Sequence, residues 1–237
     1  MIIALDIECT GLDPSKDAII EIAAVDILPD YSIDNHRSHL VCPPLPISPE
    51  ASAVHQIIDA DVAGKPPLRE VIEAYSGACA IVCHNASYER SFLGDQLGPS
   101  RKTGQPPAWI CTYKSALRVW PDFPSHNLGS LRYRLGMVTP FGIERSMLSP
   151  HRALSDAIVT AAIFVELLKH ARWSQLAMWS NEPALHTIFT FGKYRGRKYA
   201  EIATEDSSYL DWIITKSELD ADTKFSAQHA LQQREAA

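Results

Sequence analysis

The amino-acid sequence contains no long uncharged apolar run, no internal repeat and no excess of basic residues. Its longest apolar stretches, including residues 154–168, are interrupted by charged side chains, so none of them is expected to cross a membrane. The apolar residues at the start of the chain follow no basic segment and are interrupted by two acids, which argues against a secretion signal. A net charge of −6 argues against a strongly basic surface that binds nucleic acid, so any polyanionic ligand must be bound through local features or through cations.

The cysteines and the chain length set further bounds. The five cysteines are odd in number and form no Cys-x-x-Cys pair, which favours a reducing cytoplasm in which they are small core residues. With 237 residues, the chain is long enough for one large domain or for one domain plus a small appendage. We predict a main domain over residues 1–172, a linker over 173–187 that includes a helix over 173–182, and a small C-terminal module over 188–237.

Two acids lie at the end of the first predicted strand. Residues 1–8 form an apolar run that is typical of a buried strand, and side chains alternate between the two faces of a strand. Asp6 and Glu8 therefore point to one face, opposite Leu5 and Ile7. Neighbouring carboxylates in a buried site repel each other unless a cation lies between them, and oxygen ligands suit Mg²⁺ or Mn²⁺. The alternative is that the strand ends here and both acids are solvated.

The remaining pattern predicts a mixed α/β fold. Two further strands over 18–27 and 36–41 would form an antiparallel meander with the first strand. The uninterrupted apolar run 78–83 is typical of a central strand with both faces covered, and 109–111 is a second short strand. Helices between and after these strands predict a mixed sheet flanked by helices. The predicted helices cover residues 52–59, 68–76, 88–97, 114–120, 128–135 and 153–169.

Two further acids lie at the ends of predicted elements. Asp156 is near the start of the helix predicted over 153–169, on an otherwise apolar stripe, and His151 precedes it by five residues. Glu89 follows the central strand, and binding crevices in open α/β sheets form at the carboxyl ends of strands. Alone, each has a simpler explanation, because acids are common at helix starts and a lone histidine there is usually a surface or capping group. Together with the two acids of the first strand, they favour a metal site.

Three short motifs follow one another along the chain: residues 6–12 (Asp-Ile-Glu-Cys-Thr-Gly-Leu), residues 84–93 and residues 151–157. In this order they resemble the three motifs of the DnaQ-like 3′→5′ exonucleases of the DEDD group. The histidine five residues before Asp156 is typical of the histidine subgroup of that family, DEDDh. Residues 53–57 also resemble a segment that recurs between the first two motifs of the family.

The resemblance implies a ribonuclease H-like sheet and phosphodiester hydrolysis with two divalent metal ions, Mg²⁺ or Mn²⁺. Asp6, Glu8 and Asp156 would hold one ion, and Asp6 would bridge to a second ion supported by Glu89. His151 would be the general base that takes a proton from the attacking water. The expected product is a 5′-mononucleotide released from the 3′ end of DNA, and the expected substrate end is single-stranded or frayed.

The resemblance also implies contacts with the terminal nucleotide. Thr10, Gly11 and Leu12 would approach it, with Leu12 against the last base and the Gly11 backbone at the sugar. His55 and Asn85 are weaker candidates for substrate contact, and a structural role in a turn or a cap is expected equally.

One position departs from the family pattern. The second motif usually carries aspartate where this chain has Glu89, whose extra methylene moves the carboxylate by roughly one bond length. Two alternatives therefore stay open. The first is an RNA 3′ exonuclease, because the motifs do not distinguish ribose from deoxyribose. The second is a nucleic-acid-binding protein with catalysis weakened by Glu89, against which the intact remaining motif residues argue. The sequence indicates no oligomeric state.

The C-terminal module is expected to be a small α+β unit, with a strand over 188–191 and helices over 207–216 and 221–234. It is too small to bury much core alone, so we expect it to lean on the main domain or on a partner. Basic residues alternate with tyrosines over 193–199, which suits single-stranded nucleic acid, but a solvated turn with inward tyrosines explains the pattern equally well. Residues 190–196 and 209–212 resemble a C-terminal segment of bacterial members of the same family.

Overall fold

The computed structural model describes residues 1–236, and its centre is a five-stranded mixed sheet with the order β3-β2-β1-β4-β5. The first three strands form an antiparallel meander, whereas β4 pairs in parallel with β1 and β5 pairs in parallel with β4. The predicted meander and mixed sheet are therefore confirmed. The strands are β1 (Ile2–Cys9), β2 (Ile19–Ile27), β3 (Ile33–Leu40), β4 (Ala80–Cys83) and β5 (Ala108–Cys111).

The helices follow the predicted order with two differences in the first half. The helix predicted over 52–59 is split into two, because Gln56 takes a left-handed φ of 60° and ends the first of them. The helix predicted over 68–76 continues as a 3₁₀ turn. The helices are α1 (Pro49–His55), α2 (Asp59–Val62), α3 (Leu68–Val71), α4 (Ala86–Leu93), α5 (Thr112–Val119), α6 (Leu128–Arg134), α7 (Ala153–Leu167), α8 (Trp173–Asn181), α9 (Tyr199–Glu205), α10 (Ser207–Thr215) and α11 (Ala221–Ala236), with 3₁₀ turns η1 (Ile72–Tyr75), η2 (Pro140–Gly142) and η3 (Arg145–Met147).

None of the helices within residues 1–236 combines the length and the apolar character that crossing a membrane requires.

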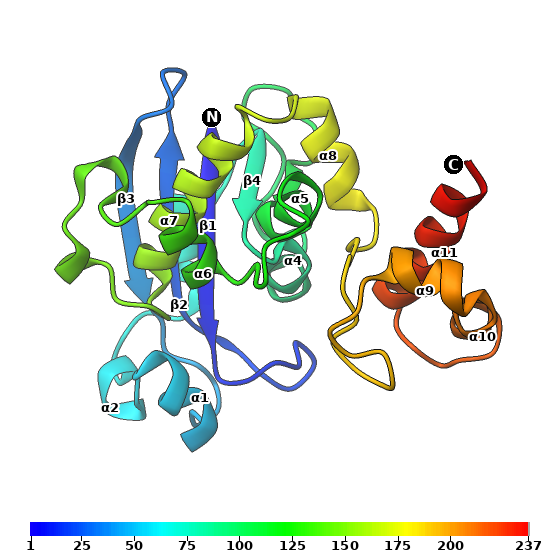
Figure 1. The fold of residues 1–237 in the computed structure, drawn as a ribbon. Helices are drawn as coiled ribbons and strands as arrows, with labels where there is room; N and C mark the ends of the chain where they lie inside the picture. The colour runs from blue at the N-terminus through cyan, green and yellow to red at the C-terminus, as the bar shows by residue number, and fades with distance from the viewer. Residues whose placement is uncertain (237) are drawn as a thin grey trace.

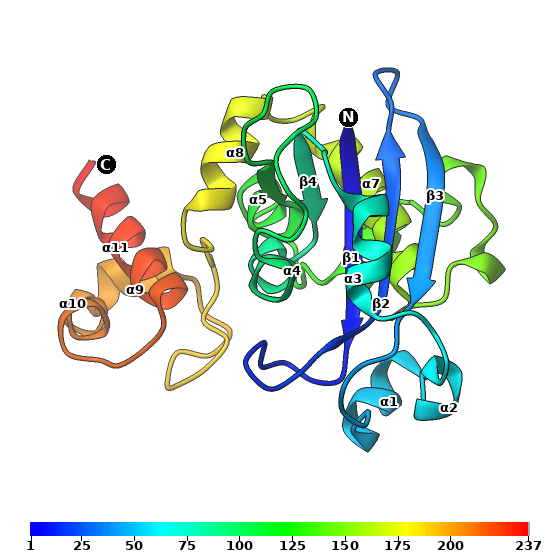
Figure 2. The ribbon, with the colours of Figure 1, turned by 180° about the vertical axis from the view of Figure 1, so that it is seen from behind.

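Helices cover both faces of the sheet. Helix α7 lies across one face, towards the viewer in Figure 1, and α3 covers the other, towards the viewer in Figure 2. Along β1, Ile3, Leu5 and Ile7 pack into the core on the α3 side, whereas Ala4 packs into the core that contains the buried side chains of α7. Because side chains alternate along a strand, Asp6 continues the face of Ala4 and points towards α7. Asp6 and Glu8 both come close to Asp156 of α7, so the predicted facing of the two acids is confirmed.

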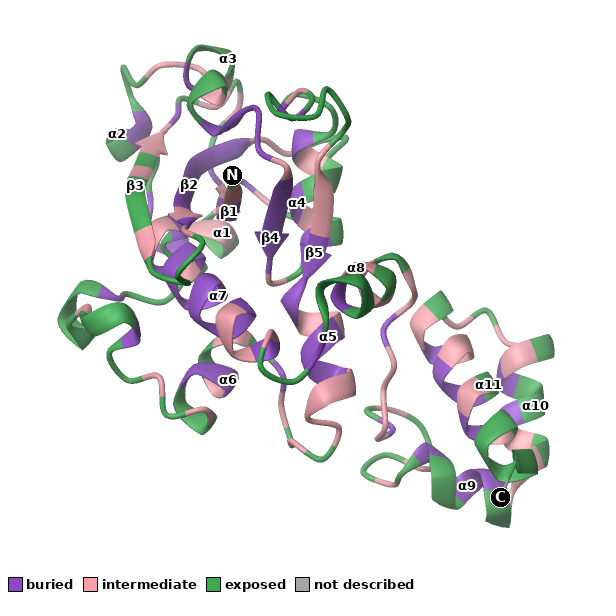
Figure 3. Cartoon of the chain, turned by 90° about the horizontal axis from the view of Figure 1, so that it is seen from above, coloured by how far each residue is buried: buried purple, intermediate pink, exposed green. Residues whose placement is uncertain are grey.

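The C-terminal module is helical and has a core of its own, visible as a separate buried group in Figure 3. Helices α9, α10 and α11 surround it. The strand predicted over 188–191 is wrong, because the described residues there form only one isolated bridge, between Ile188 and Lys198. Gly192 and Gly196, both at positive φ, turn the chain back too soon for a ladder to form. Helix α9, which follows this turn, is absent from the sequence-based prediction.

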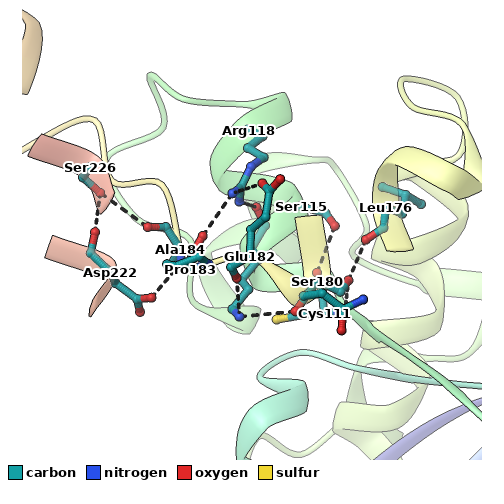
Figure 4. Close-up of polar contacts among 12 residues, drawn as sticks. Cys111, Ser115, Arg118, Leu176, Ser180, Glu182, Pro183, Ala184, Asp222 and Ser226 are labelled. Carbon is teal, nitrogen blue, oxygen red and sulfur yellow. Dashed lines mark hydrogen bonds and ion pairs between the residues drawn. The ribbon is translucent and has the colours of Figure 1, made fainter. Parts of the chain in front are cut away.

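The segment that joins the module to the sheet is bound to α5 (Figure 4). Arg118, with a side chain only 7% exposed, donates to Glu182 Oε2 at 2.9 Å and to the Pro183 carbonyl at 3.0 Å. Lys114 Nζ donates to the Glu182 carbonyl at 2.6 Å. A buried guanidinium is costly unless it is paired and hydrogen-bonded, so these contacts hold the segment against the main domain.

The same segment is bound on its other side to α11. Asp222 accepts a hydrogen bond from the Ala184 amide at 2.7 Å, and Ser226 Oγ accepts one from the His186 amide at 2.8 Å (Figure 4 shows the Asp222 contact). Residues 182–187 therefore connect the two parts through hydrogen bonds on both sides. The module leans on the main domain, as expected for a unit of this size.

Candidate active site

Three carboxylates predicted as metal ligands meet where β1 ends. Asp6 and Glu8 come from the carboxyl end of β1, and Asp156 comes from the first turn of α7, which crosses the same face of the sheet. One carboxylate oxygen from each of the three lies within 4.8 Å of the others. Residues separated by about 150 positions in the sequence thus form a single acidic cluster, with oxygen atoms close enough to share one cation.

Burial and mutual repulsion disfavour the ionised forms of these acids. Burial, then the charges of Asp156 and Glu89, raise the pKa of Asp6 well above its usual range. Burial and the Asp156 charge raise the pKa of Glu8 to about 8. Burial also raises the pKa of Asp156 to about 6, although the His151 amide opposes this by donating a hydrogen bond to its carboxylate. A cation at this point would remove the repulsion and favour ionisation.

Glu89 lies beside this cluster, in the first turn of α4. Its side chain is buried, and its Oε2 has no hydrogen-bond partner among residues 1–236. Burial, and then repulsion from Glu8, raise its pKa to about 8. A buried carboxylate oxygen without a partner is costly, and a bound cation would satisfy it. The four acids together present only oxygen donors, so the residues fit a hard divalent cation such as Mg²⁺.

His151 immediately precedes α7 and has an unusual backbone. Its φ is +56°, in the left-handed region that residues other than glycine rarely adopt. Its amide donates to Asp156 Oδ2 at 3.1 Å, and its side chain is exposed. The histidine and the acid of the third motif are therefore linked directly through the backbone amide, and the His151 side chain is exposed to solvent.

Two further charged residues at the site were not singled out from the sequence. Glu21 on β2 is the register partner of Glu8 and is 3% exposed. Its carboxylate accepts from Arg152 Nε at 3.1 Å, from Arg152 Nη2 at 2.9 Å and from the Ala153 amide at 3.1 Å. The available signal was Glu21 itself, a charged side chain inside an apolar strand, and Arg152, which lies within the third motif.

The loop after β1 contains three of the predicted substrate contacts. The hydroxyl of Thr10, which is buried, donates to Asp17 and accepts from the Ala18 amide, so it holds the loop closed. The Gly11 carbonyl accepts a hydrogen bond from Tyr88 Oη at 3.1 Å. Leu12 is 84% exposed, as a residue that meets a ligand would be. The Thr10 hydroxyl is thus occupied within the loop, whereas Leu12 is free to contact another molecule.

The two weaker candidates differ in their surroundings. His55 is buried at the end of α1, and its Nδ1 accepts from the Ile57 amide at 3.0 Å. This bond leaves Nε2 as a donor, and Nε2 has no partner with good geometry among residues 1–236. Asn85 is exposed in front of α4, and its Oδ1 accepts from Ser87 Oγ at 2.9 Å. An unmatched donor favours a ligand contact for His55, whereas the Asn85 contact is typical of a turn.

Comparison with known families identifies the class of protein. Residues 3–164 match the family described as Exonuclease, a match that covers more than half of the chain. The chain therefore belongs to the exonuclease family. Residues 189–218 match a second family, described as Exodeoxyribonuclease X-like C-terminal.

Individual relatives extend this result. The chain is 37% identical over 236 residues to Exodeoxyribonuclease 10 of Escherichia coli (strain K12), an alignment that covers 98% of this chain and 99% of that protein. A solved structure of Exonuclease X in complex with 5′ overhanging duplex DNA matches with a TM-score of 0.62 and 37% identity, over 76% of this chain and 100% of that one. The nuclease domain of 3′hExo, a DEDDh family member bound to rAMP, matches at a TM-score of 0.55 and 19% identity, over 72% and 92% of the chains, which concerns the fold alone. The expected ribonuclease H-like fold is confirmed.

Proposed function

We propose that this chain is a 3′→5′ exodeoxyribonuclease that releases 5′-mononucleotides from DNA. The observation that carries the proposal is the cluster of Asp6, Glu8 and Asp156, whose oxygen atoms lie within 4.8 Å of one another. Buried carboxylates repel one another unless a cation lies between them, so their clustering supports a metal site. The near full-length relative named Exodeoxyribonuclease 10 supports DNA as the substrate.

Two divalent ions, Mg²⁺ or Mn²⁺, would be held by these acids and by Glu89. When bound, such ions stabilise both the attacking and the leaving oxygen of an in-line displacement. Asp6, Glu8 and Asp156 would hold one, and Asp6 and Glu89 the other. The unpartnered Oε2 of Glu89 supports its part in this set despite its extra methylene. His151, linked to Asp156 through its amide, would accept the proton of the attacking water.

The terminal nucleotide would lie between the loop after β1 and α1. Leu12 is exposed and would contact the last base, while Gly11, bonded to Tyr88 through its carbonyl, would approach the sugar. Thr10 would shape this loop through its contacts with Asp17 and Ala18. The Nε2 donor of His55 would reach a sugar or phosphate oxygen. Asn85, whose Oδ1 already accepts a hydrogen bond within its turn, is the weaker candidate for a contact from the start of α4.

The expected partner is a DNA with a single-stranded or frayed 3′ end. The matched structure of Exonuclease X, in complex with 5′ overhanging duplex DNA, supports DNA as the partner. In such a duplex the 3′ end is recessed and paired, so it would have to fray before its last nucleotide could enter the site. RNA is the alternative substrate, and matched DNA and RNA oligonucleotides of one sequence would separate the two.

All five cysteines are free thiols, which supports the cytoplasm as the place of action. The division at residues 172 and 188 stays our proposal for the domain limits.

The test is release of mononucleotides from 3′-labelled single-stranded DNA with Mg²⁺, Mn²⁺ or EDTA, for the wild type and for Glu89→Asp. We expect release that depends on the metal and is abolished by EDTA. A faster Glu89→Asp would show that the longer side chain detunes the site, and an equal or slower one that the site is adapted to glutamate. If neither protein releases nucleotides but both bind DNA, the alternative of a nucleic-acid-binding protein replaces this proposal.

A further inference from the structure

Glu21 is a fifth acid at the catalytic end of the sheet, but its environment differs from that of the other four. It lies directly across from Glu8 in the β1–β2 pairing and is 3% exposed. Its two oxygens accept three hydrogen bonds, at 2.9–3.1 Å, from the Arg152 guanidinium and the Ala153 amide. A carboxylate whose oxygens are already bound in this way is satisfied within the protein, so it is not needed as a metal ligand.

The contacts of Glu21 fall at the start of α7. Arg152 precedes the first residue of the helix, and the Ala153 amide is one of the first-turn donors that a helix leaves without an internal partner. Glu21 satisfies that donor from a neighbouring strand, while the paired hydrogen bonds to Arg152 fix the direction in which the chain enters the helix. The start of α7 is thereby tied to β2, 131 positions earlier in the sequence.

His151 lies immediately before this anchored point. Its left-handed backbone, with φ at +56°, persists only where the surroundings determine it. Two contacts do so: the Arg152–Glu21 pair on its C-terminal side, and the hydrogen bond from its own amide to Asp156. Without the first contact, the segment before α7 would be free to relax towards an ordinary conformation, and the imidazole would move with it.

We propose that Glu21 and Arg152 are positioning residues that hold the backbone of His151 beside the acidic cluster. Neither residue would touch the substrate or the metal ions. The inference deepens the proposed function and rests on it, because it requires His151 to act in catalysis. Its consequence is that the two residues affect the chemical step through His151 rather than substrate binding.

The test is a double-mutant cycle with Glu21→Gln and His151→Ala, measured as steady-state release from single-stranded DNA at saturating Mg²⁺. We expect Glu21→Gln alone to lower kcat roughly 10- to 100-fold, because small misplacements of a catalytic group are costly, and to leave KM unchanged. In the His151→Ala background, the same change should have no further effect on kcat, since the residue it positions is gone. Arg152→Lys, which keeps the charge but loses the forked contact, should fall between wild type and Glu21→Gln.

Asp26→Asn is the matched control. Asp26 lies on the same strand as Glu21 and forms an ion pair with Arg37 at 2.7 Å, away from the site. The Asp26→Asn variant should lower the melting temperature, because it loses this ion pair, without changing kcat. If Glu21→Gln fails to fold, Arg152→Gln replaces it in the same double-mutant cycle. Arg152→Gln breaks the same ion pair, and the Arg152 side chain is 44% exposed.

The outcomes separate the two proposals. A His151→Ala protein with wild-type kcat would overturn the assigned role of the base and, with it, this inference. A slow His151→Ala protein combined with a normal Glu21→Gln protein would overturn the positioning role alone. Effects of Glu21→Gln and His151→Ala that multiply in the double variant would also overturn it, because they would show that Glu21 acts independently of His151.

Discussion

At the end of β1, carboxylates lie against one another, whereas in the C-terminal module Glu201, Glu205 and Asp206 lie against cations and hydroxyl groups. Burial and neighbouring charges raise the pKa of Glu8 and of Glu89 to about 8. In the module, Asp206 accepts hydrogen bonds from Tyr194 Oη at 2.6 Å and Lys193 Nζ at 3.0 Å, and these contacts with that of Ser208 hold its pKa well below its usual range. The acids at the end of β1 thus repel one another, whereas Asp206 is paired with hydrogen-bond donors within the protein.

The paired acids of the module stabilise the fold, whereas the acids at the end of β1 are available to bind a ligand. Arg197 binds Glu205 through two hydrogen bonds of 2.7 Å, and Lys198 pairs with Asp122 of the main domain at 2.8 Å. Tyr199 is buried and stacks on Phe189 with a centroid distance of 3.8 Å. Of the two interpretations of this basic and aromatic stretch, the structure therefore favours the turn with inward tyrosines over a nucleic-acid arm.

The largest expected effect comes from exchanging one acid in each region for its amide. Asp6→Asn should lower kcat by roughly 10³-fold, as loss of one preorganised electrostatic group does, and should raise the melting temperature of the metal-free protein because it removes buried repulsion. Asp206→Asn should do the reverse, lowering the melting temperature and leaving kcat unchanged. The measurements are thermal unfolding in EDTA and nucleotide release in Mg²⁺. A destabilised Asp6→Asn protein would contradict the contrast drawn between the two regions.

The site could be predicted from the sequence because its signals are local. Alternation along β1 placed Asp6 and Glu8 on one face, and the apolar stripe of α7 marked Asp156 as unusual. The pairings that hold these elements together are not local: Glu21 meets Arg152 across 131 positions, and Arg118 meets Glu182 across 64. Periodicity carries no information on such partners.

The predicted strand over 188–191 was wrong for a related reason. A short apolar run is compatible with a strand or with a core segment, and here Phe189 packs inside the module instead of joining a ladder.

A smaller effect concerns pH and metal together. Acids with raised pKa bind protons more tightly in the folded than in the unfolded chain. The free energy of unfolding of the metal-free protein should therefore fall as pH rises from about 4, the ordinary value of such acids, towards 8. Mg²⁺ binds the ionised carboxylates. At a concentration 100 times its Kd, a ligand stabilises the folded state by about 2.7 kcal/mol, and we expect the stabilisation by Mg²⁺ to be closer to this value at pH 8 than at pH 6.

Melting temperatures at both pH values, with Mg²⁺ or with EDTA, provide the measurement. Glu205 and Asp206 of the module have lowered pKa values, so their effect on the free energy of unfolding has the opposite sign. They stabilise the fold at any pH above the ordinary pKa of a carboxylate, and this contribution is lost as the pH falls below that pKa. Asp6→Asn serves as the control in which the response to Mg²⁺ should shrink. A response that is equal at pH 6 and pH 8 in the wild type would count against a cluster that exchanges protons for metal.

The smallest expected effect is the most informative about the module. If Lys193 and Arg197 are structural, Lys193→Gln/Arg197→Gln should lower the melting temperature and leave the salt dependence of KM for single-stranded DNA unchanged. If they contact phosphates, the slope of log KM against log salt should decrease by about 0.7 for each lost contact. Point substitution is sharper here than deletion after Glu182, because deletion would also remove Phe225, whose ring lies 5.8 Å from the buried Arg118 guanidinium. An unchanged slope would assign these charges to the fold, and a reduced one would place DNA on the module.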